Sequence, residues 1–138
     1  MTQSMPPDAI GDEEHLARYI FFKAHVRPNL TVKPDALIPH PYPDLSVTRH
    51  LGLTDDGVWA AGRIVEQQRQ RPLIGRADTQ ASEYRAQKLV LQANPVADNP
   101  HHAIIVGWPA DKPAQKSLAQ QIAAQTRYTP APAAEPAA

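Results

Sequence analysis

The stretch HHAIIVGWPADKPAQKSLAQQIAA, residues 101–124, places a strand pattern directly before a helix pattern. Its first part, 101–109, is the most apolar run of the chain and ends in a Trp-Pro turn, which predicts a central strand covered on both faces. Asp111 and Pro113 then provide a helix start, and apolar side chains recur on one face of 111–128. This order of patterns favours a fold in which helices pack on a sheet.

The middle of the chain repeats the same kinds of pattern. Apolar and polar side chains alternate over 45–50, as in a half-buried strand. Thr54 and the two aspartates after it form an N-terminal helix signature, which predicts a helix over 54–70. Further strands are expected at 72–80 and 87–94, with a short helical turn at 82–86 between them.

The region 10–44 is expected to hold a helix and a proline-rich arm. Acidic residues precede apolar side chains with helical spacing at Leu16, Tyr19 and Ile20, which predicts a helix over 12–24. The prolines between 28 and 43 hold the following backbone extended, so this segment is expected to wrap around the domain as an arm.

Both ends of the chain have the composition of disordered tails. Residues 1–9 are polar and contain prolines, and 129–138 read TPAPAAEPAA, a sequence that cannot bury a core. The folded core is therefore expected over 45–128. Its order of elements predicts an α+β domain with a small, largely antiparallel sheet and helices packed on one face. A mixed sheet is the alternative, because the strand-helix-strand unit at 45–78 could form a parallel crossover.

Composition narrows the functional classes. The 138 residues include 14 basic and 14 acidic side chains, so the formal net charge is zero and no global field attracts nucleic acid or an anionic membrane. The absence of cysteine excludes disulfides, thiolate nucleophiles and cysteine-rich zinc sites. The start of the chain lacks a secretory signal pattern and no apolar segment is long enough to span a bilayer, so a cytoplasmic protein is expected.

Six residues are candidates for binding a ligand or a partner. Arg76 and Asp78 lie two apart, hence on one face of a strand, where they could hold an anion or form an ion pair. His101 and His102 are adjacent, so their side chains should diverge and at most one should share a site with Arg76. Core or rim packing is a competing explanation for any aromatic candidate. The full set is Arg49, Arg76, Asp78, His101, His102 and Trp108.

Complete catalytic or metal-binding patterns are missing from the sequence. The histidines lack ligand spacing, the serines lack a nucleophile context, and no glycine-rich phosphate loop occurs. We therefore predict no catalytic residue, metal or cofactor, and a non-enzyme is favoured over an enzyme. The helix dipole accounts for Arg63, Arg69 and Arg71 near one helix end, so nucleic-acid binding is not favoured.

Four motifs follow one another between Ser46 and Tyr128: SVTRHLGL, VWAAG, LIGRAD and the opening stretch HHAIIVGWPADKPAQKSLAQQIAA. Their order resembles a group of small, uncharacterised bacterial proteins of mobile or defence-type accessory gene clusters. The opening stretch is similar to the His-Ala-x-Ile-x-Gly-Trp-Pro signature of that group. The resemblance implies an accessory protein that works beside other gene products, and it implies no particular reaction.

The leading hypothesis is a non-catalytic accessory or interaction protein that recognises a partner protein, encoded nearby, through its sheet face or its arm. The first alternative is a small domain or enzyme for an anionic ligand such as a nucleotide or phosphoester, with Arg49, Arg76 and one histidine of the pair at 101–102 as its site. A further alternative is an antitoxin-like protein that binds nucleic acid, which would require a basic patch. The oligomeric state stays open.

Overall fold

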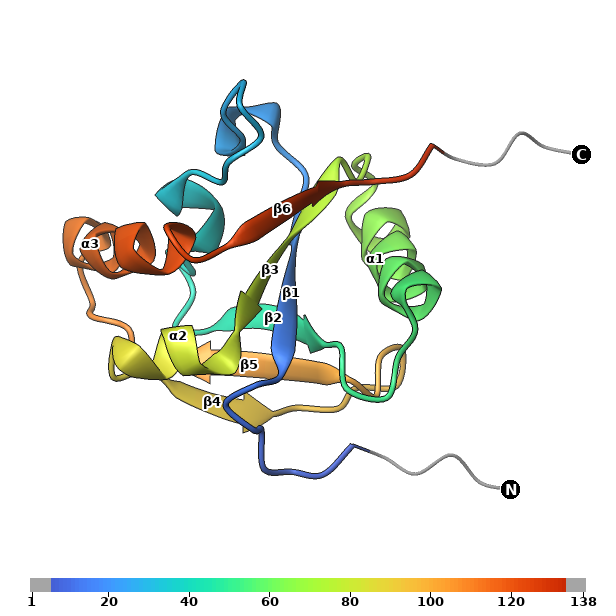
Figure 1. Cartoon of the computed structure of the whole chain (residues 1–138), viewed down its shortest axis with the longest axis horizontal. Helices are drawn as coiled ribbons and strands as arrows, with labels where there is room; N and C mark the ends of the chain where they lie inside the picture. Colours follow the sequence, from blue (N-terminus) through green and yellow to red (C-terminus); the bar gives the residue numbers. More distant parts are fainter. Residues whose placement is uncertain (1–5, 134–138) are drawn as a thin grey trace, which may run out of the picture.

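The computed structural model describes residues 6–133, in which one sheet of six strands carries helices on both sides (Figure 1). The strands are β1 (His15–Ile20), β2 (Leu45–Arg49), β3 (Gly75–Gln80), β4 (Val90–Ala93), β5 (His102–Val106) and β6 (Arg127–Pro130). The helices are α1 (Asp55–Arg69), α2 (Ala81–Ala86) and α3 (Lys112–Ala123), with two short 3-10 turns, η1 (Lys23–His25) and η2 (Pro34–Leu37).

The strand order is β4-β5-β2-β1-β3-β6, and every neighbouring pair is antiparallel. The predicted α+β class with an antiparallel sheet is therefore confirmed. The helix α1 joins β2 and β3, which run in the same direction, but β1 lies between them, so the mixed-sheet alternative is wrong. In Figure 1, β2, β4 and β5 run across the direction of the neighbouring strand β1, so the sheet turns sharply between β2 and β1.

The helices are divided between the two faces of the sheet, where the sequence predicted one covered face. The larger core lies on the face of Leu16, Ile20 and Ile105, and α2, α3 and η2 contribute to it. On the opposite face α1 packs so closely that a Cβ on Gly62 would lie 2.7 Å from the ring of Tyr19.

The strand order explains why the helices lie on both faces of the sheet. The crossovers β2-α1-β3 and β5-α3-β6 start from antiparallel strands and proceed in the same direction across the sheet. Crossovers of this kind are nearly always right-handed. Because the two crossovers start from strands of opposite direction, equal handedness places α1 and α3 on opposite faces of the sheet.

The helix predicted over 12–24 is wrong, because these residues form β1 near the centre of the sheet. All six residues of β1 pair with β3, from His15 opposite Gln80 to Ile20 opposite Gly75. The competing signal is the run Tyr-Ile-Phe-Phe at 19–22, whose aromatic and β-branched side chains favour a strand. Pairing on both sides then outweighs the local helical spacing.

The proline-rich segment also differs from a free arm. Pro34 begins the 3-10 turn η2, where a fixed φ suits the first helical position, and Leu37 is fully buried in the larger core. This segment is therefore part of the packing under α3.

At both ends of the described chain, residues 6–133, the backbone is bonded to the rest of the fold. The carbonyl oxygens of Pro7 and Ala9 accept hydrogen bonds from Arg49. The helix predicted to Tyr128 ends at Ala123, and the edge strand β6 includes Pro130, so the expected disorder from 129 onward is wrong at its start. Residues 1–5 and 134–138 lie outside the described residues. Within 6–133, no helix combines the length and apolar character needed to cross a membrane.

Candidate binding site

Arg76 and Asp78 lie together on β3, as predicted, in an ion-pair network under the start of α1. Asp78 accepts a hydrogen bond from Nε of Arg76 at 3.0 Å, and its other oxygen lies 2.9 Å from Nε2 of His50. Nη2 of Arg76 donates to Asp55 at 2.5 Å, and the guanidinium carbon lies 4.6 Å from the ring centroid of Trp59. Burial lowers the pKa of Arg76, but the hydrogen bonds and charges of the two aspartates outweigh it and raise the pKa. The charge of Arg76 is thus compensated within the fold.

Arg49 lies on the face of the sheet opposite to Arg76, and its charge is compensated as well. Its Nε and Nη2 donate to the two carboxylate oxygens of Glu14 at 2.7 and 2.9 Å, and Nη1 donates to the carbonyl of Pro7 at 2.6 Å. Burial raises the pKa of Glu14, but the hydrogen bonds from Arg49 and from the backbone of Gly11 hold it below its ordinary value. Arg49 therefore anchors the N-terminal segment and does not join Arg76.

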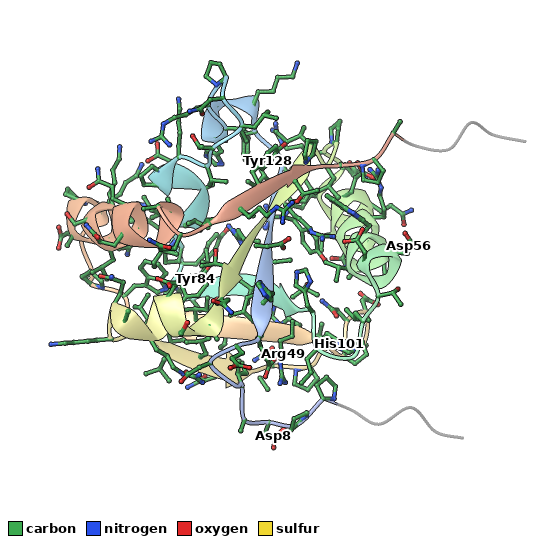
Figure 2. The ribbon with its side chains drawn as sticks, in the orientation of Figure 1. Asp8, Arg49, Asp56, Tyr84, His101 and Tyr128 are labelled. Carbon is green, nitrogen blue, oxygen red and sulfur yellow. The ribbon has the colours of Figure 1, made fainter. Side chains whose placement is uncertain are left out.

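The two adjacent histidines diverge, as strand alternation requires. His102 lines a cavity on the α1 face, and its Nδ1 lies 2.8 Å from the carbonyl oxygen of Asn94. His101 lies beside Arg49, whose backbone N–H donates to its carbonyl oxygen, and both side chains appear at the lower end of the sheet in Figure 2. Nδ1 of His101 is buried without a hydrogen-bond partner among residues 6–133.

The indole of Trp108 has a structural role. Its Nε1 donates to the carbonyl of Ile105 at 2.9 Å, and the ring packs against the larger core. The six candidates predicted from the sequence therefore occupy several places on both faces of the sheet, and only His102 among them lines the cavity on the α1 face.

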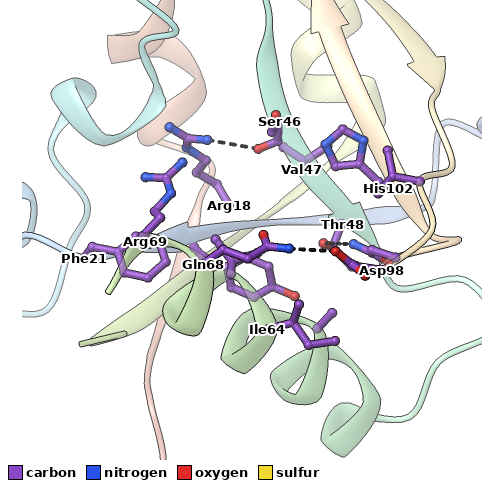
Figure 3. A pocket seen from close by; sticks show the side chains of 15 residues that line it. Arg18, Phe21, Ser46, Val47, Thr48, Ile64, Gln68, Arg69, Asp98 and His102 are labelled. Carbon is purple, nitrogen blue, oxygen red and sulfur yellow. Dashed lines mark hydrogen bonds between the residues drawn. The ribbon is translucent and has the colours of Figure 1, made fainter. Parts of the chain in front are cut away.

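A cavity of about 250 Å³ lies between the C-terminal half of α1 and the face of β2 and β5 (Figure 3). Its apolar lining comes from Phe21, Val47, Ala61, Ile64, Val65 and Val96. Its polar lining comes from Arg18, Tyr19, Ser46, Thr48, Gln68, Arg69, Asp98, Asn99 and His102. The cavity thus combines an apolar lining with polar and charged side chains.

Arg18 and Arg69 lie beside each other at one end of this cavity (Figure 3). Arg18, on β1, is half-buried and donates to the carbonyl oxygens of Ala36 at 3.3 Å and Ser46 at 3.1 Å. Arg69, in the last turn of α1, has its guanidinium carbon 5.0 Å from the ring centroid of Phe21. Neither arginine forms an ion pair with a carboxylate of residues 6–133.

The electrostatics of Arg18 differ from those of Arg49 and Arg76. Burial, reinforced by the positive charge of Arg69, lowers the pKa of Arg18 from its ordinary value to about 10. The protonated form is therefore held at a cost in free energy, which a negative charge placed between the two guanidinium groups would offset. Arginine suits such a role because its planar fork matches carboxylate and phosphate groups.

The other end of the cavity carries hydrogen-bonding groups and one negative charge. Nε2 of Gln68, on α1, donates to Asp98 at 2.7 Å, and Nδ2 of Asn99 donates to the hydroxyl of Thr48 at 2.9 Å (Figure 3). These bonds tie the loop after β4 to α1 and to β2, and they fix the wall of the cavity on that side.

A second hollow meets the cavity at the arginine pair. It lies toward η2 and the segment 38–44, and it shares Arg18, Ser46 and Arg69 with the cavity. The guanidinium groups can therefore be approached from two sides.

Sequence reasoning missed both arginines for identifiable reasons. Arg18 was placed in a helix, whereas in β1 it alternates with the buried Leu16 and Ile20. The pairing of β1 with β2 ends at Ala17, and the half-buried Arg18 side chain donates to the carbonyl of Ser46 at the edge of the cavity. Arg69 was assigned to the helix dipole. The useful signal is an arginine between apolar residues of a strand, because a charged side chain at such a position requires polar partners.

Within residues 6–133 no group of three or more side chains that could hold a metal ion comes together. Comparisons with protein-family models, with curated proteins and with solved structures give no match. The fold and the site thus define the protein by its architecture, an α+β domain with a cavity that ends in an arginine pair.

Proposed function

We propose that the protein is a non-catalytic binding domain for a small ligand with an anionic group, which Arg18 and Arg69 hold at the end of the cavity. The observation that supports the proposal is the pair of neighbouring guanidinium groups without a carboxylate partner in the described chain. The anionic-ligand hypothesis is thereby kept, with these two residues in place of Arg49 and Arg76.

The volume limits the size of the ligand. A cavity of about 150 Å³ accommodates benzene in an engineered protein, and the present cavity measures about 250 Å³. A ring or a short chain with a few further atoms therefore fits inside. The apolar lining would bury its body, and each charge-assisted hydrogen bond to an arginine would contribute roughly 1.5–3 kcal/mol.

Calorimetric titration of the protein with benzoate and with phenyl phosphate tests this proposal. The variants Arg18→Met and Arg69→Gln should each weaken binding at least about tenfold, or about 1.4 kcal/mol. Arg127→Gln is the matched control, because it removes an exposed positive charge on β6, outside the cavity lining. Equal affinity in all variants, or no saturable binding at millimolar concentrations, would refute the proposal.

The role of a bacterial accessory protein that recognises a partner remains a second proposal. It is supported by the apolar part of the sheet beyond α1, where Val90 is 52% exposed and Ile104 and Val106 are half-buried. These three side chains share one face of β4 and β5. Co-purification with the products of neighbouring genes, and its loss in Val90→Lys, would support this role, whereas capture unaffected by that substitution would exclude this face.

A further inference from the structure

We infer that the ligand is zwitterionic, with its anionic group at the arginine pair and a cationic amine at Asp98, at the opposite end of the cavity. The inference rests on the proposed function, since it names the chemical class of ligand for that same site. The class is a small amino-carboxylate with an apolar body between its two charges.

Asp98 supplies the charge that such an amine needs. Its Oδ2 accepts the hydrogen bond from Gln68 at 2.7 Å, whereas its Oδ1 has no hydrogen bond and no basic side chain of residues 6–133 pairs with it. The donor from Gln68 leaves the net negative charge in place. Asp98 is therefore the acidic counterpart of Arg18 and Arg69 on the rim of one cavity.

The loop that carries Asp98 is built to hold it in place. Val96 and Asn99 exchange two backbone hydrogen bonds of 3.1 and 3.0 Å, which closes a tight turn around Asp98. The side chain of Asn99 donates to Thr48 and accepts from the backbone N–H of His101 at 3.0 Å. The turn is thus anchored on β2 and on the residue that precedes β5, so the exposed carboxylate of Asp98 is carried by an ordered loop, which lowers the entropy cost of binding there.

The space between the charges favours an apolar body. Val47 from β2, Ile64 and Val65 from α1 and Val96 from the turn line this part of the cavity. A ligand with a methylene chain or a ring would bury its body there while both of its ends are neutralised. An unsubstituted carboxylate would gain only the arginine contacts.

Two series of ligands of equal length test the inference. The first comprises linear carboxylates with a terminal amine, from aminobutanoate to aminooctanoate, and the second comprises the unsubstituted carboxylates with the same chains. Binding is followed by amide chemical shifts, which detect millimolar affinities and show whether the cavity residues respond. At the best chain length the amine should raise the affinity at least about tenfold, or about 1.4 kcal/mol.

Variants separate the two ends of the site. Asp98→Asn should abolish the gain from the amine, because it removes the charge at nearly constant shape. Asp56→Asn, at the far end of α1, is the control and should preserve the gain. Arg18→Met should weaken both series.

The outcomes distinguish the inference from the proposed function. If the amine fails to raise the affinity at any chain length, or if the gain in affinity survives in Asp98→Asn, the inference of a zwitterionic ligand is refuted. When the unsubstituted carboxylates still depend on Arg18, the proposed function stands without it. If neither series depends on Arg18, both fall together.

Discussion

Replacing Arg18 by methionine tests whether this arginine serves a ligand or the fold. The lowering of its pKa from the ordinary value to about 10 corresponds to a cost of about 3 kcal/mol for the charged form. The substitution removes that cost and keeps most of the side-chain volume. It also removes the hydrogen bonds to the carbonyls of Ala36 and Ser46, which contribute about 1 kcal/mol each. We therefore expect the ligand-free protein to keep its free energy of unfolding within about 1 kcal/mol or to gain stability.

Arg49→Met is the matched comparison, because the same substitution there removes an arginine whose charge is paired with the Glu14 carboxylate. The side chains of Arg49 and Glu14 are only 2% and 9% exposed. Methionine at this position leaves the Glu14 carboxylate buried without its partner. Breaking a buried pair in this way costs roughly 3–5 kcal/mol.

Urea denaturation at neutral pH, without added ligand, measures both variants against the unaltered protein. Trp59 and Trp108 lie in different packing clusters, so their fluorescence reports on both sides of the sheet. If Arg18→Met loses as much stability as Arg49→Met, the charge of Arg18 stabilises the fold, and the argument for a ligand site at the arginine pair fails.

Three further predictions concern the fold. Gly62→Ala should destabilise the protein by about 1–3 kcal/mol, because its Cβ would lie 2.7 Å from the ring of Tyr19; an unchanged denaturation midpoint would contradict this packing. Thr54→Ala should cost about 1 kcal/mol through loss of the α1 cap, measured in the same way, whereas no loss would show that the cap is dispensable. Because the pKa of Glu14 is held below 4.5, its pairing with Arg49 stabilises the protein above that pH and is lost as the pH falls through the lowered value. Glu14→Gln should flatten the pH dependence of stability in that range, and an identical acid profile would refute the assignment.

Local patterns were sufficient for the elements whose signals lie within a few residues. Thr54 accepts the hydrogen bond from the backbone of Gly57, and Asp111 accepts one from that of Ala114, so both long helices begin where their caps predict. These caps act over a single turn and depend little on the rest of the chain.

Elements determined by distant pairing were predicted less well. The residues of β1 have helical spacing, yet they lie between β2 and β3, where two rows of backbone hydrogen bonds and burial on both faces favour the strand. The edge strand β6 forms only because β3 offers a free edge beside it. Neither partner can be recognised from a short window of sequence.

The candidate site depended on the same distant contacts. Arg76 and Asp78 were correctly placed on one face because strand alternation is local, but their partners Asp55 and His50 come from other elements. Arg18 and Arg69 are 51 positions apart in the sequence. They come together only because β1 lies under the end of α1.

The most direct test of the ligand site is the affinity for benzoate, measured by calorimetry in the unaltered protein and in Arg18→Met. We predict saturable binding of one benzoate per chain, weakened at least about tenfold in the variant, while the variant keeps its stability. Equal affinity in the two proteins, or a failure of the unaltered protein to bind, would contradict it.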